Sequence, residues 1–354
     1  MRGQNILAVW DRMGDYHRAR VDALRKEFPD RTVFSADLGK NDSLYGWNST
    51  ENSLHHQLSS KPPGSFDFGR VVKFIKLLSS SNIGCVCIAG YGRPEYIIFI
   101  LYAWLTRRKV ILFAESWYAS FAFFESLKSL FLRCCVDGFL VSGKRAQDHF
   151  VQRMKIDDKK IRIGYSVVDN DHFATPDRTP SRRILCAARF APEKNLEALI
   201  CSFRESDLPS KGWELTIVGG GPLSTRLHDQ AAGAPVTLAD WQSYAQLPAL
   251  YRNASVFVLP SLFEPWGLVV NEAMASGLPV ILSKQVGCLP DLLSEGANGW
   301  SFDANVPKNL TDIFNTLCNR SESELAEMGH RSLNIVKTYS VQLFASNLKA
   351  LILP

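Results

Sequence analysis

The chain lacks a long apolar run. Hydrophobic residues make up 46% of its 354 residues, yet no uninterrupted stretch approaches the roughly 20 residues that cross a bilayer. The first residues, Met1–Asp11, become charged too early for a signal peptide and predict a strand instead. We therefore expect a cytoplasmic protein rather than a secreted or membrane-spanning one.

Two chemical signatures are also absent. The eight cysteines have no metal-ligand spacing, and most lie in apolar runs, which favours buried, reduced thiols over a metal site. No G-x-G-x-x-G motif follows the first apolar run with an acidic residue about twenty positions later. A dinucleotide-dependent oxidoreductase is therefore excluded.

Acidic residues are scarce in the first half. Residues 1–170 contain 25 Lys and Arg against 17 Asp and Glu, whereas residues 171–354 contain 15 against 18. Basic and bulky apolar residues mix in the segments 73–78, 106–109 and 121–133. This mixture is typical of an interfacial helix on anionic lipid, and equally of a buried helix with a solvated edge, so both interpretations stay open. Nucleic acid is not an expected partner, because no helix carries a basic stripe interleaved with aromatic residues.

Apolar runs alternate with helical patterns along the chain, which predicts βαβ units and parallel sheets. We expect an α/β protein of two doubly wound domains, residues 1–170 and 183–335, joined by a linker over 171–182 that contains prolines. A helix in 336–354 ends the chain, and residues 42–65 predict a long loop. The strands predicted in the first half are Ile6–Trp10, Gly84–Ala89, Val110–Ala114, Gly138–Val141 and Ile161–Gly164.

The segment Pro260–Val280 sets two carboxylates about a predicted helix start. Pro265 favours an extended Glu264, and a helix that opens at 266–267 places Glu272 about one to two turns inside, leaning back toward the N-terminus. We expect both carboxylates to reach the space in front of the helix, where free N–H groups favour phosphate. This is a design for the sugar, ribose and diphosphate of a nucleotide sugar; an ordinary core helix with solvated acids is the alternative.

Two further loops follow strand-like runs. Arg189 and Lys194 lie in the loop after 182–188, and Gly219, Gly220 and Gly221 follow 213–218. In a parallel sheet such loops share the carboxyl edge, where ligands of open α/β folds bind. Arginine and lysine suit a diphosphate, and glycines let backbone approach a ligand closely.

With these motifs, residues 180–305 resemble a family 4 glycosyltransferase, a retaining, nucleotide-sugar-dependent enzyme of the two-domain GT-B fold. The resemblance implies two Rossmann-like domains facing a cleft, with the acceptor on the first, the donor on the second, and the last helix crossing back to the first. It implies that Glu264 contacts the transferred sugar, Glu272 the ribose, and Arg189 and Lys194 the diphosphate. The donor-site residues implied in addition are Gly219, Gly220, Gly221, Trp241, Pro265, Trp266, Gly267 and Leu268. Trp266 stands where the family has Phe or Tyr, and Trp241 is placed to read the base or to pack in the core.

The acceptor side is less specific. By resemblance, Gly14 lies beside the donor phosphates, whereas His17 could contact the acceptor or cap a helix. Glu115 stands near the place where several relatives have a catalytic His, and it could orient a hydroxyl or cap the next helix. Tyr91 and Arg93 are further candidates.

Asp169-Asn170-Asp171 matches the D-x-D metal signature of the other main glycosyltransferase fold. It lies in the predicted linker, where turn or capping duty suits Asp and Asn better, so we expect no required metal and no other cofactor.

The expected activity is retaining transfer of a sugar from a UDP- or GDP-sugar to a glycan or lipid-linked acceptor in cell-surface polysaccharide synthesis. The protein would be cytoplasmic, with peripheral contact to the anionic inner face of the membrane through the basic first half. A non-catalytic nucleotide-sugar-binding scaffold and a GT-B-fold nucleotide-sugar epimerase are the alternatives.

Overall fold

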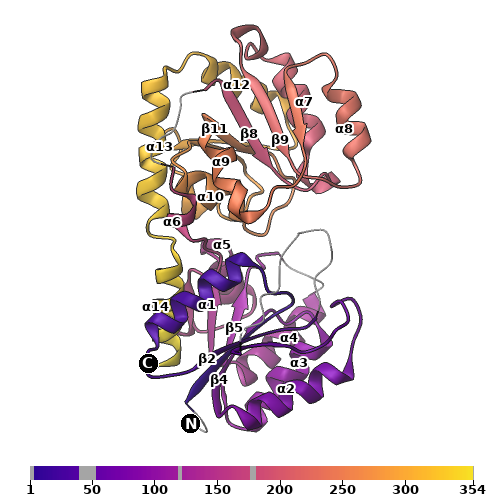
Figure 1. Cartoon of the computed structure of the whole chain (residues 1–354), viewed down its shortest axis with the longest axis vertical. Helices are drawn as coiled ribbons and strands as arrows, with labels where there is room; N and C mark the ends of the chain where they lie inside the picture. The colour runs from indigo at the N-terminus through magenta and orange to yellow at the C-terminus, as the bar shows by residue number, and fades with distance from the viewer. Residues whose placement is uncertain (1–3, 40–52, 119–121, 176–180, 354) are drawn as a thin grey trace. The chain divides into compact units, whose positions relative to one another are not determined.

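The computed structural model describes residues 4–39, 53–118, 122–175 and 181–353, without the side chains of 122–124. Its contacts divide the chain into an N-terminal unit, Met1–Val168 with Val341–Pro354, and a C-terminal unit, Asp169–Ser340. Each unit is a parallel β-sheet with helices packed on it (Figure 1). The predicted α/β class with two parallel-sheet domains is confirmed. Among the described residues, no helix has both the length and the apolar character to span a bilayer.

The sheet of the N-terminal unit has seven parallel strands in the order β3-β2-β1-β4-β5-β6-β7. Its strands are β1 (Asn5–Trp10), β2 (Val33–Asp37), β3 (His55–Gln57), β4 (Ile83–Ala89), β5 (Lys109–Ala114), β6 (Gly138–Val141) and β7 (Ile161–Ile163). All five strands predicted in this half are present. The loop predicted over 42–65 is wrong in part, because β3 pairs with β2 inside it; residues 40–52 lie outside the described part.

The α-helices of this unit are α1 (Asp15–Glu27), α2 (Phe68–Ser80), α3 (Pro94–Leu105), α4 (Ala122–Cys135), α5 (Lys144–Asp148) and α14 (Val341–Ile352), and a π-helical turn (His149–Arg153) follows α5. The helix α14 lies beside α1 and packs on β5, β6 and β7 (Figure 1). Asn347 fixes it by donating to the carbonyl of Ile163 at 2.8 Å. The end of the chain therefore belongs to the first unit, beginning at Val341 rather than at 336.

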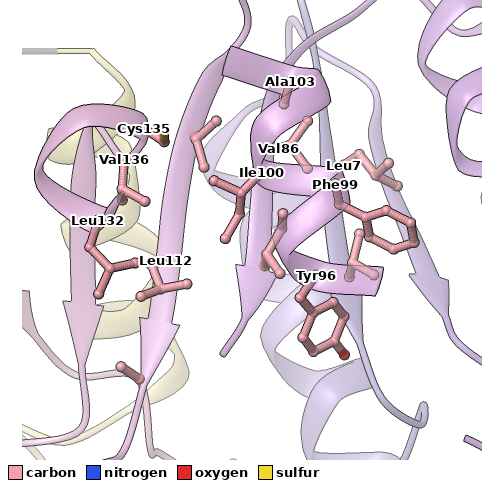
Figure 2. Packing of buried hydrophobic residues seen from close by; sticks show 14 of the residues in the cluster. Leu7, Val86, Tyr96, Phe99, Ile100, Ala103, Leu112, Leu132, Cys135 and Val136 are labelled. Atoms are coloured by element: carbon pink, nitrogen blue, oxygen red, sulfur yellow. The ribbon is translucent and has the colours of Figure 1, made fainter. Parts of the chain in front are cut away.

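The helix α3 fills the centre of the N-terminal core. Its buried face points Phe99, Ile100 and Ala103 at the sheet, which presents Val86 of β4 and Leu112 of β5 (Figure 2). On one side Leu132, Cys135 and Val136 continue the cluster (Figure 2). Apolar packing thus holds α3 against the middle strands of the sheet.

The sheet of the C-terminal unit has six parallel strands in the order β10-β9-β8-β11-β12-β13. These strands are β8 (Arg183–Ala187), β9 (Glu214–Val218), β10 (Val236–Ala239), β11 (Val256–Leu259), β12 (Val280–Ser283) and β13 (Gly299–Phe302). The helices are α6 (Asn170–Phe173), α7 (Leu196–Glu205), α8 (Ser224–Ala231), α9 (Leu247–Arg252), α10 (Leu268–Ala275), α11 (Leu289–Leu292), α12 (Pro307–Cys318) and α13 (Glu322–Val336). In both units the strand order reverses once, between β1 and β4 and between β8 and β11.

A buried ion pair joins α2 and α3. Arg70 and Glu95 are fully buried and lie 2.7 Å apart. The guanidinium also donates to the carbonyls of Leu38 at 2.7 Å and Pro62 at 2.8 Å. Because these carbonyls belong to the chain on either side of β3, Arg70 holds this loop region onto the helices.

Glu95→Ala should lower the free energy of unfolding of the N-terminal unit by about 3–5 kcal/mol, since it leaves a buried guanidinium without its counter-ion. Urea denaturation followed by circular dichroism measures this loss. The matched control is Asp22→Ala, which removes the exposed ion pair of Asp22 with Arg25 and should change stability little. Equal effects of the two substitutions would contradict the structural role of Arg70 and Glu95.

Candidate functional site

The loops that follow β8 and β11 meet where the strand order of the C-terminal sheet reverses. Neighbouring loops at such a point leave a crevice at the carboxyl ends of the strands. Leu262, after β11, donates its backbone N–H to the carbonyl of Glu193, after β8, at 2.9 Å. The two loops are therefore held together by their own backbone.

Lys194 and Glu264 form the charged centre of this junction. The ammonium Nζ lies 2.5 Å from Oε2 of the carboxylate, and each side chain is 14% exposed. Both side chains are thus mostly buried but still accessible to a ligand, and solvent screens their charges less than those of a surface ion pair. The sequence placed these two residues in one site, and the structure brings them into contact.

Arg189 takes a different position. Its guanidinium is exposed and pairs with Glu193 at 2.5 Å on the same loop. The two cations expected to converge therefore differ: Lys194 points into the junction, whereas Arg189 lies on its exposed side and is tied to a neighbouring acid.

The triple glycine packs against the loop after β8. A Cβ at Gly219 would lie 1.9 Å from the carbonyl oxygen of Ala188, and one at Gly221 would lie 2.7 Å from that of Phe190. Phe190 donates its N–H to the carbonyl of Gly220 at 2.9 Å. Glycine is therefore required at 219 and 221 because the backbone of the loop after β8 packs directly against them. The sequence analysis expected a different reason, the close approach of a ligand to the backbone.

Trp241 lies over the same turn. Its side chain is 40% exposed, and a Cβ at Gly220 would lie 3.2 Å from its Nε1. Of the two interpretations left open by the sequence, core packing does not fit this exposure. The indole therefore lies partly exposed beside the glycine turn.

Gly267 begins α10 with φ +100°, a conformation that favours glycine. A Cβ there would lie 3.3 Å from Cγ of Glu264 and 3.1 Å from Leu259. The amides of Leu268 and Val269, at the start of α10, have no helical carbonyl ahead of them, whereas Val270 donates to the carbonyl of Gly267 at 2.9 Å. The helix therefore starts beside Glu264 and after Pro265, as the sequence predicted.

Trp266 is buried. Its side chain is therefore not available to contact the nucleotide-sugar donor, contrary to the expectation from the sequence. Its Nε1 donates to Oδ1 of Asn271 at 2.8 Å, and its ring lies 6.0 Å from that of Tyr339. The buried indole satisfies its N–H with this polar partner inside the unit. A ligand at the start of α10 would meet only the backbone of Trp266.

Glu272 is also buried, at 1% exposure. Its Oε2 accepts a hydrogen bond from the hydroxyl of Tyr251 on α9 at 2.6 Å. The expectation that both carboxylates reach the same open space is therefore wrong for the structure as it stands. Glu264 precedes the helix and is reachable, whereas Glu272 lies on the side of α10 that packs against α9.

The N-terminal unit has its own junction after β1 and β4. Arg93 pairs with Asp11 at 2.8 Å, and the hydroxyl of Tyr96 donates to the same carboxylate at 2.5 Å. Asp11, Arg93 and His17 line a hollow of about 340 Å³. Gly14 stands one turn earlier as the N-cap of α1.

His17 contributes to the start of α1. Its Nδ1 accepts the backbone N–H of Gly14 at 3.3 Å, and its ring lies 5.0 Å from that of Trp10. Burial first, and then the charge of Arg20, lower the pKa of His17 well below its usual value. Helix capping, one of the two roles weighed from the sequence, is thus present, and the imidazole also borders the hollow beside Asp11.

A second hollow, of about 370 Å³, lies after β4 and β5 and is lined by Glu115, Tyr91 and Glu125. Ser166 donates to Oε1 of Glu115. Burial, followed by the charge of Glu125, raises the pKa of Tyr91 to about 12. Two carboxylates and a protonated phenol therefore face one small space.

Sequence reasoning missed Arg20, which packs against a residue that lines both hollows. It is buried, donates to the carbonyl of Val167 at 2.9 Å, and lies 4.9 Å from the ring centre of Tyr165. Tyr165 lines both hollows. No local pattern marks Arg20, since its surroundings on α1 resemble those of any amphipathic helix.

Asp169 caps α6 by accepting the N–H of Asp171 at 3.2 Å. This is the capping role that the sequence favoured for the triplet. Over the described part of the chain, no cluster of three or more His, Cys, Asp or Glu side chains could hold a metal ion.

Comparison with known proteins identifies the C-terminal unit. Residues 167–331 match the family model described as Glycosyl transferases group 1. This part of the chain is similar to a group 1 glycosyl transferase domain. The resemblance predicted from the motifs is confirmed for this part of the chain, whereas family 4 membership and retention stay predictions.

Two curated relatives match part of the chain. A D-inositol 3-phosphate glycosyltransferase from Corynebacterium glutamicum is 31% identical over 151 residues, 40% of this chain and 36% of the relative. A sulfoquinovosyl transferase from Arabidopsis thaliana is 29% identical over 179 residues, 46% of this chain and 34% of the relative. The match thus spans little more than a third of the length of these relatives.

Solved structures extend the likeness to the whole fold. HepE from Anabaena, solved in complex with UDP, has a TM-score of 0.75 at 15% identity over 99% of both chains. Sucrose-phosphate synthase from Thermosynechococcus elongatus has a TM-score of 0.74 at 16% identity, over 99% of this chain and 98% of that one. At this identity the likeness establishes the fold, and the predicted GT-B fold is confirmed.

His17 should stay neutral at a pH where an imidazole of the denatured chain, with a pKa of about 6.5, becomes protonated. Because the folded pKa is the lower one, protonation favours the unfolded state, and stability of the N-terminal unit should fall as the pH drops below about 6.5. Burial lowers the pKa of His149 as well, so the test compares the wild type with His17→Gln. The substitution should flatten the fall, measured by urea denaturation at several pH values; an identical slope, or an NMR titration of His17 near pH 6.5, would contradict its burial as a neutral group.

Proposed function

We propose that the chain is a glycosyltransferase that moves a sugar from a nucleotide-diphosphate donor, a UDP- or GDP-sugar, with retention of configuration. The observation that carries the proposal is the contact of Lys194 with Glu264 at the strand-order reversal of the C-terminal unit. A cation and a carboxylate at one point suit a ligand that has both phosphate oxygens and sugar hydroxyls. The start of α10 adds unpaired amides beside them.

In this proposal the diphosphate lies against Lys194 and the first turn of α10, with Arg189 turning from Glu193 toward it. Glu264 accepts hydrogen bonds from hydroxyls of the transferred sugar, and the exposed indole of Trp241 stacks on the base. When the bond to the diphosphate breaks, negative charge grows on the leaving phosphate and positive charge on the sugar ring. The two cations would stabilise the first charge. No residue is assigned as a carboxylate nucleophile, which leaves front-face attack, with the leaving phosphate assisting deprotonation, as the proposed route.

The acceptor is proposed to bind the N-terminal unit, in the hollow bordered by Glu115, Tyr91 and Glu125. Carboxylates and phenols make hydrogen bonds with hydroxyl groups, which suits the hydroxyls of a glycan or lipid-linked sugar. The proposed setting is cell-surface polysaccharide synthesis at the cytoplasmic face of the membrane. No metal ion is required in this scheme, because Lys194 and the helix start supply the positive charge.

The proposal is tested with the purified protein and a panel of UDP-, GDP-, dTDP- and ADP-sugars, reading thermal shift and slow donor hydrolysis together. Selective stabilisation by one donor, lost in Lys194→Met and unaffected by excess EDTA, is the expected result. Donor binding without hydrolysis or transfer would favour a scaffold, and conversion of the sugar without loss of nucleotide would favour an epimerase. Activity abolished by EDTA and restored by Mg²⁺ or Mn²⁺ would overturn metal independence.

Glu272→Gln separates a ribose-binding role from a purely structural one. If Glu272 binds ribose, the donor dissociation constant should rise at least about tenfold, the loss of about 1.4 kcal/mol, when measured by calorimetry. The matched control is Tyr251→Phe, which removes the hydrogen bond to Glu272 but keeps the carboxylate; it should cost about 1–3 kcal/mol of stability and change donor affinity less. Equal donor affinity in the wild type and Glu272→Gln would sink the ribose role and leave Glu272 as a partner of Tyr251.

A further inference from the structure

The helix α3 is apolar on all sides. One face packs on the sheet through Tyr96, Phe99, Ile100 and Ala103 (Figure 2). The opposite side presents a second apolar stripe at helical spacing, in which Trp104 is 45% and Leu105 is 69% exposed. The other members of this stripe are Ile97 and Leu101. A helix that is apolar all round is normally covered on every side.

The neighbouring helices carry further exposed apolar side chains. Both α2 and α4 contact α3, and Figure 1 shows the three helices in one region of the N-terminal unit. On α2, Phe68 and Val72 are exposed, and on α4, Leu127 and Leu130 are exposed. We name this surface the α2–α3–α4 face. Exposed apolar side chains that gather on neighbouring helices are typical of interaction sites.

Cations outnumber acids on and beside the α2–α3–α4 face, where the acids beside the helices are Asp67, at the N-cap of α2, and exposed Asp137, after α4. Among the side chains described on these three helices, the acids are sheltered: Glu95 is buried against Arg70, and Glu125 is 14% exposed. The exposed cations on and beside the helices are Lys73, Lys76, Arg107 and Arg133. A partner that fits this face is therefore apolar and bordered by negative charge.

We propose that the α2–α3–α4 face binds the surface of an anionic lipid bilayer. The stripe of α3 enters the boundary between headgroups and acyl chains, while the basic side chains reach lipid phosphates from its edge. A second copy of the chain fits this face less well, because twofold pairing would bring two copies of the same predominantly basic surface together. The inference rests on the proposed function for its biological purpose, access to a lipid-linked acceptor, but its test requires no donor.

Sedimentation with vesicles tests this inference. The full chain should co-sediment with vesicles of phosphatidylglycerol and phosphatidylcholine at about 0.1 M salt, and much less with pure phosphatidylcholine. Leu105→Glu, and separately the pair Lys73→Glu and Lys76→Glu, should weaken binding by about tenfold or more. All three positions are exposed, so these variants should fold, which circular dichroism and melting temperature verify.

Matched controls lie in the C-terminal unit. Val306 and Lys308 are exposed there, and Val306→Glu and Lys308→Glu place a carboxylate at an exposed apolar and an exposed basic position without touching the α2–α3–α4 face. Both should bind vesicles as the wild type does. Calorimetry of UDP- and GDP-sugar binding is run on the same variants, so that failure of vesicle binding and failure of donor binding are seen separately.

The fluorescence of Trp104 reports whether α3 inserts into the bilayer. Brominated phosphatidylglycerol should quench part of the tryptophan fluorescence of the wild type, and Trp104→Phe should lose this part while still binding vesicles. Absence of binding to anionic vesicles, or equal binding by Leu105→Glu, would overturn the inference. A dimer in solution that Leu105→Glu converts to a monomer would overturn it in favour of a second copy of the chain.

Discussion

The C-terminal unit depends on the order of its parallel strands. Because the order reverses between β8 and β11, the chains leaving these strands turn to opposite faces of the sheet and leave room between their loops. Lys194 stands on one loop and Glu264 on the other, and they meet at 2.5 Å. The backbone bond from Leu262 to Glu193 and the glycine at 219, which admits the carbonyl of Ala188, hold the junction closed around them. A change of register would separate the pair without altering either residue.

The N-terminal unit repeats the strand order but places different chemistry at the reversal. There the ion pair of Asp11 and Arg93 stands beside a buried neutral imidazole, and the adjoining hollow is bordered by Glu115 and Tyr91. These side chains offer hydrogen bonds rather than a net positive charge, so this hollow suits hydroxyl groups better than a diphosphate. The contrast between the two junctions supports the proposal that donor and acceptor bind different units.

Sequence reasoning succeeded where patterns are long or motifs are local. The central strands are continuous apolar runs, and the contact of Lys194 with Glu264 follows from the loops in which they stand. It failed for β3, whose three residues His55–Gln57 are polar and pair only at the sheet edge. It also placed Glu272 in the open, because helical spacing gives the direction of a side chain but not the neighbouring helix, here α9 with Tyr251, that covers it. The burial of Trp266 depends in the same way on distant Tyr339.

The basic and apolar segments of the first half, 73–78, 106–109 and 121–133, flank α3 in the sequence, and the far side of this helix supports the membrane-binding interpretation that we propose. A buried helix with a solvated edge needs polar residues on that edge, and from Tyr96 to Leu105 no residue is charged. From its sequence alone such a helix is predicted to lie in the core, because the sequence does not show how many sides of the helix other elements cover. The structure covers one side with the sheet and the flanks with α2 and α4, which leaves Trp104 and Leu105 in water. Removing such side chains from water contributes about 25 cal/mol per Å², so an apolar layer that covers them is favoured, and the surrounding cations select one with negative charge.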